Sequence, residues 1–292
     1  SQVDRRFVND IGPQKMNFVK AASQVVTSRQ VDKSPSEPLP LRHLDAASLA
    51  DVHGPVIYRL GHSSMLIKLG EDLLLIDPVF SERASPLQWA GPKRFHPVPL
   101  EPEALPQITA VVISHNHYDH LDKDTVRRLA GKVDYFVVPL GVGEHLRDWG
   151  VDEDAIVELD WWNELELGDL TLAATPAQHF SGRTLTDRNK TLWASWVIQG
   201  AGANLFFSGD SGYFDGFREI GERYGPFDIT MIENGAYNEA WRTVHMMPEE
   251  SVQAHIDLKG RAMLPIHNST FDLSIHAWYE PLDRVSALAR QR

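Results

Sequence analysis

Short apolar runs separated by turn residues alternate along the chain with segments of helical periodicity. Residues 56–60, 65–69 and 73–76 read as strands, and Gly70-Glu71-Asp72 predicts a hairpin between the last two. Further strands are predicted at 110–113, 135–138, 156–159, 165–167, 170–172, 192–199, 204–207, 228–232 and 261–266. Helices are predicted at 121–129, 142–149, 214–224, 248–258 and 276–292. This mixture predicts an α/β fold class, and the absence of an obvious break favours one main domain.

The first fifty-one residues are the least regular part of the chain. A short helix is predicted at 16–30, and the prolines at positions 35, 38 and 40 favour an extended segment after it. We therefore expect residues 1–51 to form an arm that packs on a main domain at 52–292.

Histidine and aspartate side chains are most concentrated at residues 114–120, which read Ser-His-Asn-His-Tyr-Asp-His. An apolar run precedes this segment and a helical segment follows it, so the polar side chains lie on a turn after a buried strand. Imidazole and carboxylate groups suit zinc and similar metals. His115 and His117 alternate with a non-ligand and can reach one ion, whereas Asp119 and His120 are placed for a second ion close by.

This segment resembles the HxHxDH motif of the metallo-β-lactamase superfamily. The remaining ligands of that family follow as a His, an Asp in a Gly-Asp turn and a final His, and His179, Asp210 and His267 occur in that order. The resemblance covers about 56–282. It implies an αββα sandwich of the metallo-β-lactamase type, with two mixed sheets packed face to face and helices outside.

The resemblance also implies two divalent metal ions, most readily zinc, with manganese or iron as alternatives. The implied ligands of the first ion are His115, His117 and His179, those of the second are Asp119, His120 and His267, and Asp210 bridges the two. A bridging hydroxide would attack the substrate, so no nucleophilic side chain is required. The absence of cysteine and of a Gly-x-Ser-x-Gly elbow agrees with this.

Some of these residues and their neighbours are candidates for catalysis beyond metal binding. Asp119 and Asp210 are expected to be catalytic as well as ligands. Tyr118 lies between ligands, so its hydroxyl is expected to reach the substrate, with packing of its ring under the turn as the alternative. Three other histidines are candidates for orienting a phosphate or a ligand, with capping or surface roles as the alternative: His62, His245 and His276.

Several stretches resemble N-acyl-phosphatidylethanolamine-hydrolysing phospholipase D and its bacterial relatives, among them 114–122, 175–179 and 224–228. This implies lipid metabolism, in which a phosphodiester is hydrolysed to a phosphomonoester and a free alcohol. The proline-rich segment 81–106, with Trp89 and Phe95, is expected to form one wall of the site. Asn268-Ser269 departs from that family, which has Trp and Gly there, so the lipid and leaving group stay open.

Two other functions compete with this interpretation. A sugar-phosphate lactonase, or another hydrolase, could use the same metal site. A non-catalytic metal-binding regulatory protein could also keep the fold. The regulatory alternative is disfavoured because all seven ligand positions are filled.

Composition limits the expected binding partners and the expected cellular compartment. The 292 residues are 42% hydrophobic and carry a net charge of −12, which argues against nucleic acid as a partner and against simple electrostatic docking on anionic lipid. A small-molecule or lipid phosphodiester remains the expected substrate, with peripheral membrane contact through a local patch or apolar groove. The lack of cysteine suits a soluble protein of the cytoplasm or the periplasm. Ser1 at the start is consistent with removal of a leader or anchor. The oligomeric state stays open.

Overall fold

The computed structural model describes residues 2–3, 6–9, 32–45, 47, 49, 52 and 54–291. The helix predicted at 16–30 lies outside these residues, as does much of the arm at 1–51. The described start of the arm forms a small antiparallel pair, β1 (Gln2–Val3) and β2 (Arg6–Phe7). Phe7 is buried and its N–H donates to the carbonyl of Asn189 at 2.8 Å, so this part of the arm lies on the main domain.

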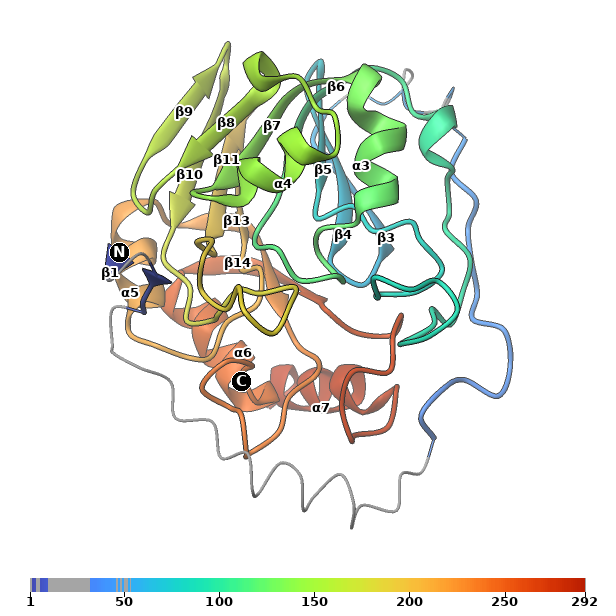
Figure 1. Ribbon diagram of the computed structural model, residues 1–292. Helices are drawn as coiled ribbons and strands as arrows, with labels where there is room; N and C mark the ends of the chain where they lie inside the picture. Colours follow the sequence, from blue (N-terminus) through green and yellow to red (C-terminus); the bar gives the residue numbers. More distant parts are fainter. Residues whose placement is uncertain are drawn as a thin grey trace.

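Two six-stranded sheets form the centre of the molecule (Figure 1). In spatial order, the first holds β3 (Val56–Gly61), β4 (Ser64–Leu69), β5 (Asp72–Ile76), β6 (Ile108–Val112), β7 (Val133–Pro139) and β8 (Ile156–Leu159). The second holds β14 (Gly260–Ile266), β13 (Phe227–Glu233), β12 (Ala203–Phe207), β11 (Ser195–Gly200), β10 (Leu170–Thr175) and β9 (Glu164–Leu167). Each sheet contains antiparallel and parallel pairs, so both are mixed.

The inner faces of the two sheets share one apolar core. Ile67 and Val112 of the first sheet pack in the same buried cluster as Trp196 and Phe207 of the second. The clusters on the outer faces are covered by helices: α3 (Lys123–Leu129) and α4 (Val142–Asp148) on the first sheet, and α5 (Gly216–Arg223) and α6 (Pro248–Asp257) on the second. Helix α7 (Glu280–Ala289) packs on α6. This architecture confirms the αββα sandwich.

Three short 3-10 helices complete the described elements, at Pro102–Ala104, Ala130–Lys132 and Glu153–Ala155. No helix within the described residues is both long and apolar enough to cross a bilayer.

The strands of both sheets deliver polar residues to one edge of the sandwich. In the first sheet, β5 leads into Asp77 and β6 leads into the turn at 114–120. In the second, β10, β12 and β14 lead into His179, Asp210 and His267. Turns at the carboxyl ends of neighbouring strands meet, and in open α/β sheets ligands bind at such ends.

Several predicted boundaries were wrong, and two of them have a clear physical reason. The helix predicted at 121–129 begins only at Lys123, because Asp122 adopts an extended backbone and its carboxylate accepts from the Asp124 N–H, as an N-cap does. The strand predicted at 192–199 begins at Ser195. The preceding residues bond across to the other sheet instead, where the Ala194 N–H donates to the Ser114 carbonyl at 2.9 Å.

Candidate metal centre

A buried aspartate anchors the turn that carries the histidines. Asp77 follows β5, and its two carboxylate oxygens accept from the Ser114 backbone N–H at 2.7 Å and the Ser114 hydroxyl at 2.6 Å. The same carboxylate lies 2.7 Å from Nδ1 of His120, which directs the opposite nitrogen, Nε2, into the site. Burial raises the pKa of Asp77, an effect that His120 opposes. Asp77 therefore fixes both the start of the turn and the ring of His120.

One group of ligand atoms brings together His115, His117, His179 and Asp210, all within 4.8 Å of one another. Nε2 of His115 is 2.8 Å from Nδ1 of His117, and Nε2 of His179 is 3.3 Å from that same atom. The Val244 carbonyl lies 2.9 Å from Nδ1 of His179, so this nitrogen donates and Nε2 faces the group. Burial lowers the pKa of His117 to about 4, which keeps the imidazole neutral, as a metal ligand must be.

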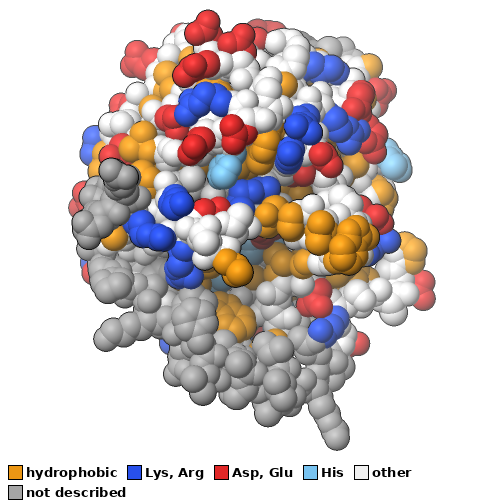
Figure 2. All heavy atoms as spheres, viewed as in Figure 1, with side chains coloured by type: hydrophobic (Ala, Val, Ile, Leu, Met, Phe, Trp, Pro, Cys, Tyr) orange, Lys and Arg blue, Asp and Glu red, His pale blue; other side chains and the backbone are white. Residues whose placement is uncertain are grey.

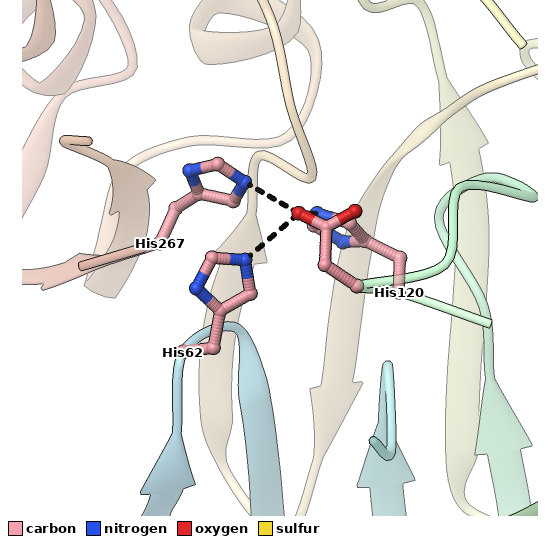
Figure 3. Close-up of side chains that lie close together, drawn as sticks. His62, His120 and His267 are labelled. Carbon is pink, nitrogen blue, oxygen red and sulfur yellow. Dashed lines mark hydrogen bonds and ion pairs between the residues drawn. The ribbon is translucent and has the colours of Figure 1, made fainter. Parts of the chain in front are cut away.

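A second group lies beside the first and contains His62, Asp119, His120 and His267. The rings of His62 and His267 turn toward the Asp119 carboxylate, at 3.0 and 3.2 Å (Figure 3). His120 approaches from the other side, with Nε2 at 3.5 Å. The three rings come from three separate elements, so only the folded chain creates this group.

Asp210 joins the two groups. Its Oδ2 lies 3.8 Å from the nearest nitrogens of His115 and His179 and 3.2 and 3.1 Å from those of His120 and His267. Burial alone would lower the pKa of His267, but the carboxylates of Asp210 and Asp119 raise it to about 10. A carboxylate in this position neutralises positive charge on both sides of it.

The donor atoms suit divalent cations. Oδ1 of Asp210 and Nε2 of His120 are buried and make no hydrogen bond within the described part of the chain. Buried polar atoms are usually satisfied, so such atoms at the meeting point of nitrogen and oxygen donors indicate that a ligand belongs there. Divalent metal ions take this set of imidazole and carboxylate ligands.

Sequence reasoning placed Glu233 beside the site, as a departure from the resembled family, but assigned it no role. It ends β13, is fully buried, and accepts from the Met246 N–H at 2.6 Å. Its other oxygen lies 3.2 Å from Nδ1 of His245, and His245 stacks on His267 with ring centroids 5.2 Å apart. The two residues form a third group with Asp210 and His267. The available signal was a charged residue directly after the apolar run at 228–232.

A cavity of about 250 Å³ opens over these groups. Its apolar walls are Phe180, Trp241, Val244 and Leu273, and several candidate ligands form its polar floor together with His245. The expectation that 81–106 would wall the site was wrong for this cavity, since no residue of that segment is among those that line it. Instead, the segment lines a neighbouring cavity of about 350 Å³, and Trp89 is 78% exposed.

Neither Tyr118 nor His276 belongs to the histidine groups. The Tyr118 hydroxyl donates to the Arg183 carbonyl at 3.0 Å, and the Arg183 guanidinium lies 4.0 Å from the centre of its ring. Nδ1 of His276 is 2.9 Å from the Ala277 carbonyl and its ring stacks on Tyr237. Their expected contact with a substrate stays a prediction.

Asn268 directly follows His267. Its carbonyl and side-chain oxygens accept from Nη2 of Arg59 at 2.7 and 2.8 Å, and its side chain is buried. Asn268 is not among the residues that line the cavity over the histidines. Asn268, where the resembled family has Trp, therefore braces the turn that carries His267 by bonding to Arg59.

The chain is similar to known proteins in both sequence and fold. Residues 73–268 match the family model described as a beta-lactamase superfamily domain. An uncharacterized protein of Mycobacterium tuberculosis is 47% identical over 273 residues, which cover 90% of this chain and 72% of that protein. N-acyl-phosphatidylethanolamine-hydrolyzing phospholipase D 1 of Caenorhabditis elegans is 35% identical over 268 residues, covering 87% of this chain and 75% of that protein. Among solved structures, Igni18, a metallo hydrolase of Ignicoccus hospitalis, is similar with a TM-score of 0.60 at 23% identity, covering 80% of this chain and 91% of that one.

Proposed function

The chain belongs to the beta-lactamase superfamily and is a metal-dependent hydrolase, and on this premise we propose that it cleaves phosphodiesters of the phospholipid type. The observation that carries the proposal is the pair of His/Asp groups joined by Asp210 beneath a cavity with apolar walls. Such a cavity suits a substrate with one apolar arm and one anionic centre. The similarity to the phospholipase D of Caenorhabditis elegans supports the same reaction class.

We propose two divalent ions in the metal centre, with zinc favoured and manganese or iron as alternatives. His115, His117 and His179 would hold one ion, Asp119, His120 and His267 the other, and Asp210 both. When bound, two such ions activate water and stabilise charge on a phosphoryl oxygen. His62 would hold the Asp119 carboxylate in place from behind, at 3.0 Å.

The chain's own residues supply binding and proton transfer. Phe180, Trp241 and Leu273 would hold the apolar arm and exclude water from the reacting centre. Nδ1 of His245 faces the buried Glu233 carboxylate, which leaves Nε2 on the opposite side of the ring. We propose that Nε2 of His245 donates a proton to the departing alcohol oxygen, as a general acid does. Glu233 would stabilise the protonated ring and fix its direction.

Replacing Asp77 by asparagine is expected to weaken metal binding by about 10- to 100-fold. The carboxylate accepts two hydrogen bonds from Ser114 and contacts Nδ1 of His120, whereas the amide of asparagine has only one acceptor oxygen and no charge, so it cannot replace both carboxylate oxygens. Titration against a chelating dye and elemental analysis would measure this loss, with two ions per chain expected in the unmodified protein. Asp72→Asn is the matched control, because Asp72 begins the same strand and its carboxylate accepts from the Thr109 hydroxyl, away from the histidine turn. An Asp77→Asn protein with unchanged affinity would contradict the role.

The proposed reaction is tested by hydrolysing N-acyl-phosphatidylethanolamine in ¹⁸O-labelled water. Attack at phosphorus should place the label in the phosphate product and leave the released alcohol unlabelled. A label in the alcohol would indicate C–O cleavage and contradict the proposed attack. If no phosphodiester is turned over at any metal loading while a sugar-phosphate lactone is, the phosphodiesterase proposal fails and the lactonase alternative takes its place.

A further inference from the structure

Two loops beside the catalytic cavity present large apolar side chains to solvent. In the loop at 81–95, Leu87 and Trp89 are 45% and 78% exposed, and in the loop at 180–190 Leu185 is fully exposed. The two loops are neighbours, because residues from both line the cavity of about 350 Å³ next to Tyr118. The second loop begins at Phe180, which forms a wall of the catalytic cavity. The apolar tips therefore stand beside the cavity of about 350 Å³, and the second loop continues from them to the wall of the catalytic cavity.

Hydrogen bonds within each loop hold these tips outward. The side chain of Gln88 accepts from the Arg83 N–H at 3.1 Å and donates to the Arg83 carbonyl at 3.1 Å, so its two neighbours point away from the turn. In the second loop, the Asp187 carboxylate accepts from the N–H groups of Arg183 and Thr184, which closes a turn with Leu185 at its tip. Apolar exposure on braced loops indicates a contact surface.

The two loops have a net positive charge, opposite in sign to the net charge of the whole chain. Each loop carries three basic residues and one acidic residue, whereas the whole chain has a net charge of −12. Glu82 pairs with Lys93 at 2.6 Å and Asp187 is used within its turn. Arg188 and Lys190 are exposed, and the Arg188 guanidinium lies 4.5 Å from the centre of the Phe180 ring. Figure 2 views this face and shows hydrophobic side chains on one side of a hollow and Lys and Arg side chains on the other.

We propose that this face docks on an anionic lipid bilayer. Leu87, Trp89 and Leu185 enter the interfacial region, where tryptophan is favoured, and Arg188 and Lys190 contact lipid phosphates. The negative charge elsewhere on the chain is repelled by an anionic membrane within the screening length of about 10 Å, which favours the orientation with this face toward the membrane. The proposal rests on the proposed function because the substrate is taken to be a membrane lipid. Docking would bring the catalytic cavity to the membrane surface that contains this lipid.

Sedimentation with sucrose-loaded vesicles tests the docking face. The protein should bind vesicles of phosphatidylcholine with phosphatidylglycerol, and the double variant Trp89→Ser/Leu185→Ser should bind at least about tenfold more weakly. Arg188→Gln/Lys190→Gln should lose about 30-fold on these vesicles and change little on pure phosphatidylcholine. Ile256→Ser, on α6 and exposed to the same extent as Leu87, is the matched control and should bind as the parent does.

Three results would overturn the docking proposal: a parent protein that ignores both kinds of vesicle, face variants that bind as the parent does, or self-association that these variants abolish. The last would make the face an interface between copies of the chain. Hydrolysis of soluble bis(p-nitrophenyl) phosphate separates docking from catalysis, because none of the substituted residues lines the catalytic cavity. Vesicle binding without any phosphodiester hydrolysis would leave docking intact and defeat the proposed function, and hydrolysis without binding would do the reverse.

Discussion

An Asp210→Asn variant is expected to lose about 10³-fold in turnover while keeping its fold. Oδ2 of Asp210 lies near histidines of both groups, at 3.1 and 3.2 Å in one and 3.8 Å in the other. Burial would raise the pKa of Asp210, but His120 and His267 hold this pKa well below its usual range, so the carboxylate is ionised. An amide has no charge with which to neutralise two cations, and the charge balance of the centre is lost.

The measurement is kcat on bis(p-nitrophenyl) phosphate together with metal content and a thermal melt. Asp215→Asn is the control, because Asp215 is exposed, lies five residues further along, and belongs to neither group. A melt close to that of the parent would separate loss of catalysis from loss of structure. Retention of most of the parent rate by Asp210→Asn would show that this carboxylate does not join the two sites.

The order of strands and turns along the sequence was predictable because apolar runs and turn residues report local structure. The runs before His115, Asp210 and His267 predicted that each follows a strand, and each does. Sheet order was not predictable from periodicity, since it depends on pairings between distant segments, such as β5 with β6 across a long loop. The sandwich came from the resemblance to a family, and the two sheets confirm it.

The residues that support the histidines could not be predicted, because their roles depend on contacts between distant segments. Asp77 read as the end of a hairpin arm, yet it lies 2.7 Å from Nδ1 of His120, 43 residues further along. Trp89 read as a wall of the site, but the bonds of Gln88 within its own turn leave Trp89 facing solvent. Composition showed an aromatic loop and could not show which way the loop faces.

The last helix was predicted to begin at 276 and begins at Glu280. The Trp278 N–H donates to the carbonyl of Asp32 at 3.0 Å, and Nδ1 of His276 contacts the carbonyl of Ala277 at 2.9 Å. The bond to Asp32 holds Trp278 against an early part of the chain in place of a helical turn. Helical periodicity contains no information on such a contact.

A His245→Ala variant is expected to distinguish leaving groups. With an alkyl phosphodiester the departing oxygen needs a proton, so kcat should fall by about 10²- to 10⁴-fold. With bis(p-nitrophenyl) phosphate the leaving group departs as an anion without a proton, so the fall should be about tenfold or less. Glu233→Gln should show the same pattern more weakly, because an amide still accepts from the Met246 N–H but cannot stabilise a protonated ring.

A larger loss of kcat on the alkyl phosphodiester than on bis(p-nitrophenyl) phosphate would identify His245 as the proton donor, because a purely structural role would lower both rates alike. His245 also stacks on His267 and packs edge-on against His179, so its removal could loosen the ligands. Metal content of the variant controls for that effect, and His255→Ala provides a matched histidine on α6 that contacts Thr230 away from the cavity. Equal losses on both substrates, with the metal retained, would assign Glu233 and His245 to substrate positioning and leave the proton donor to another group.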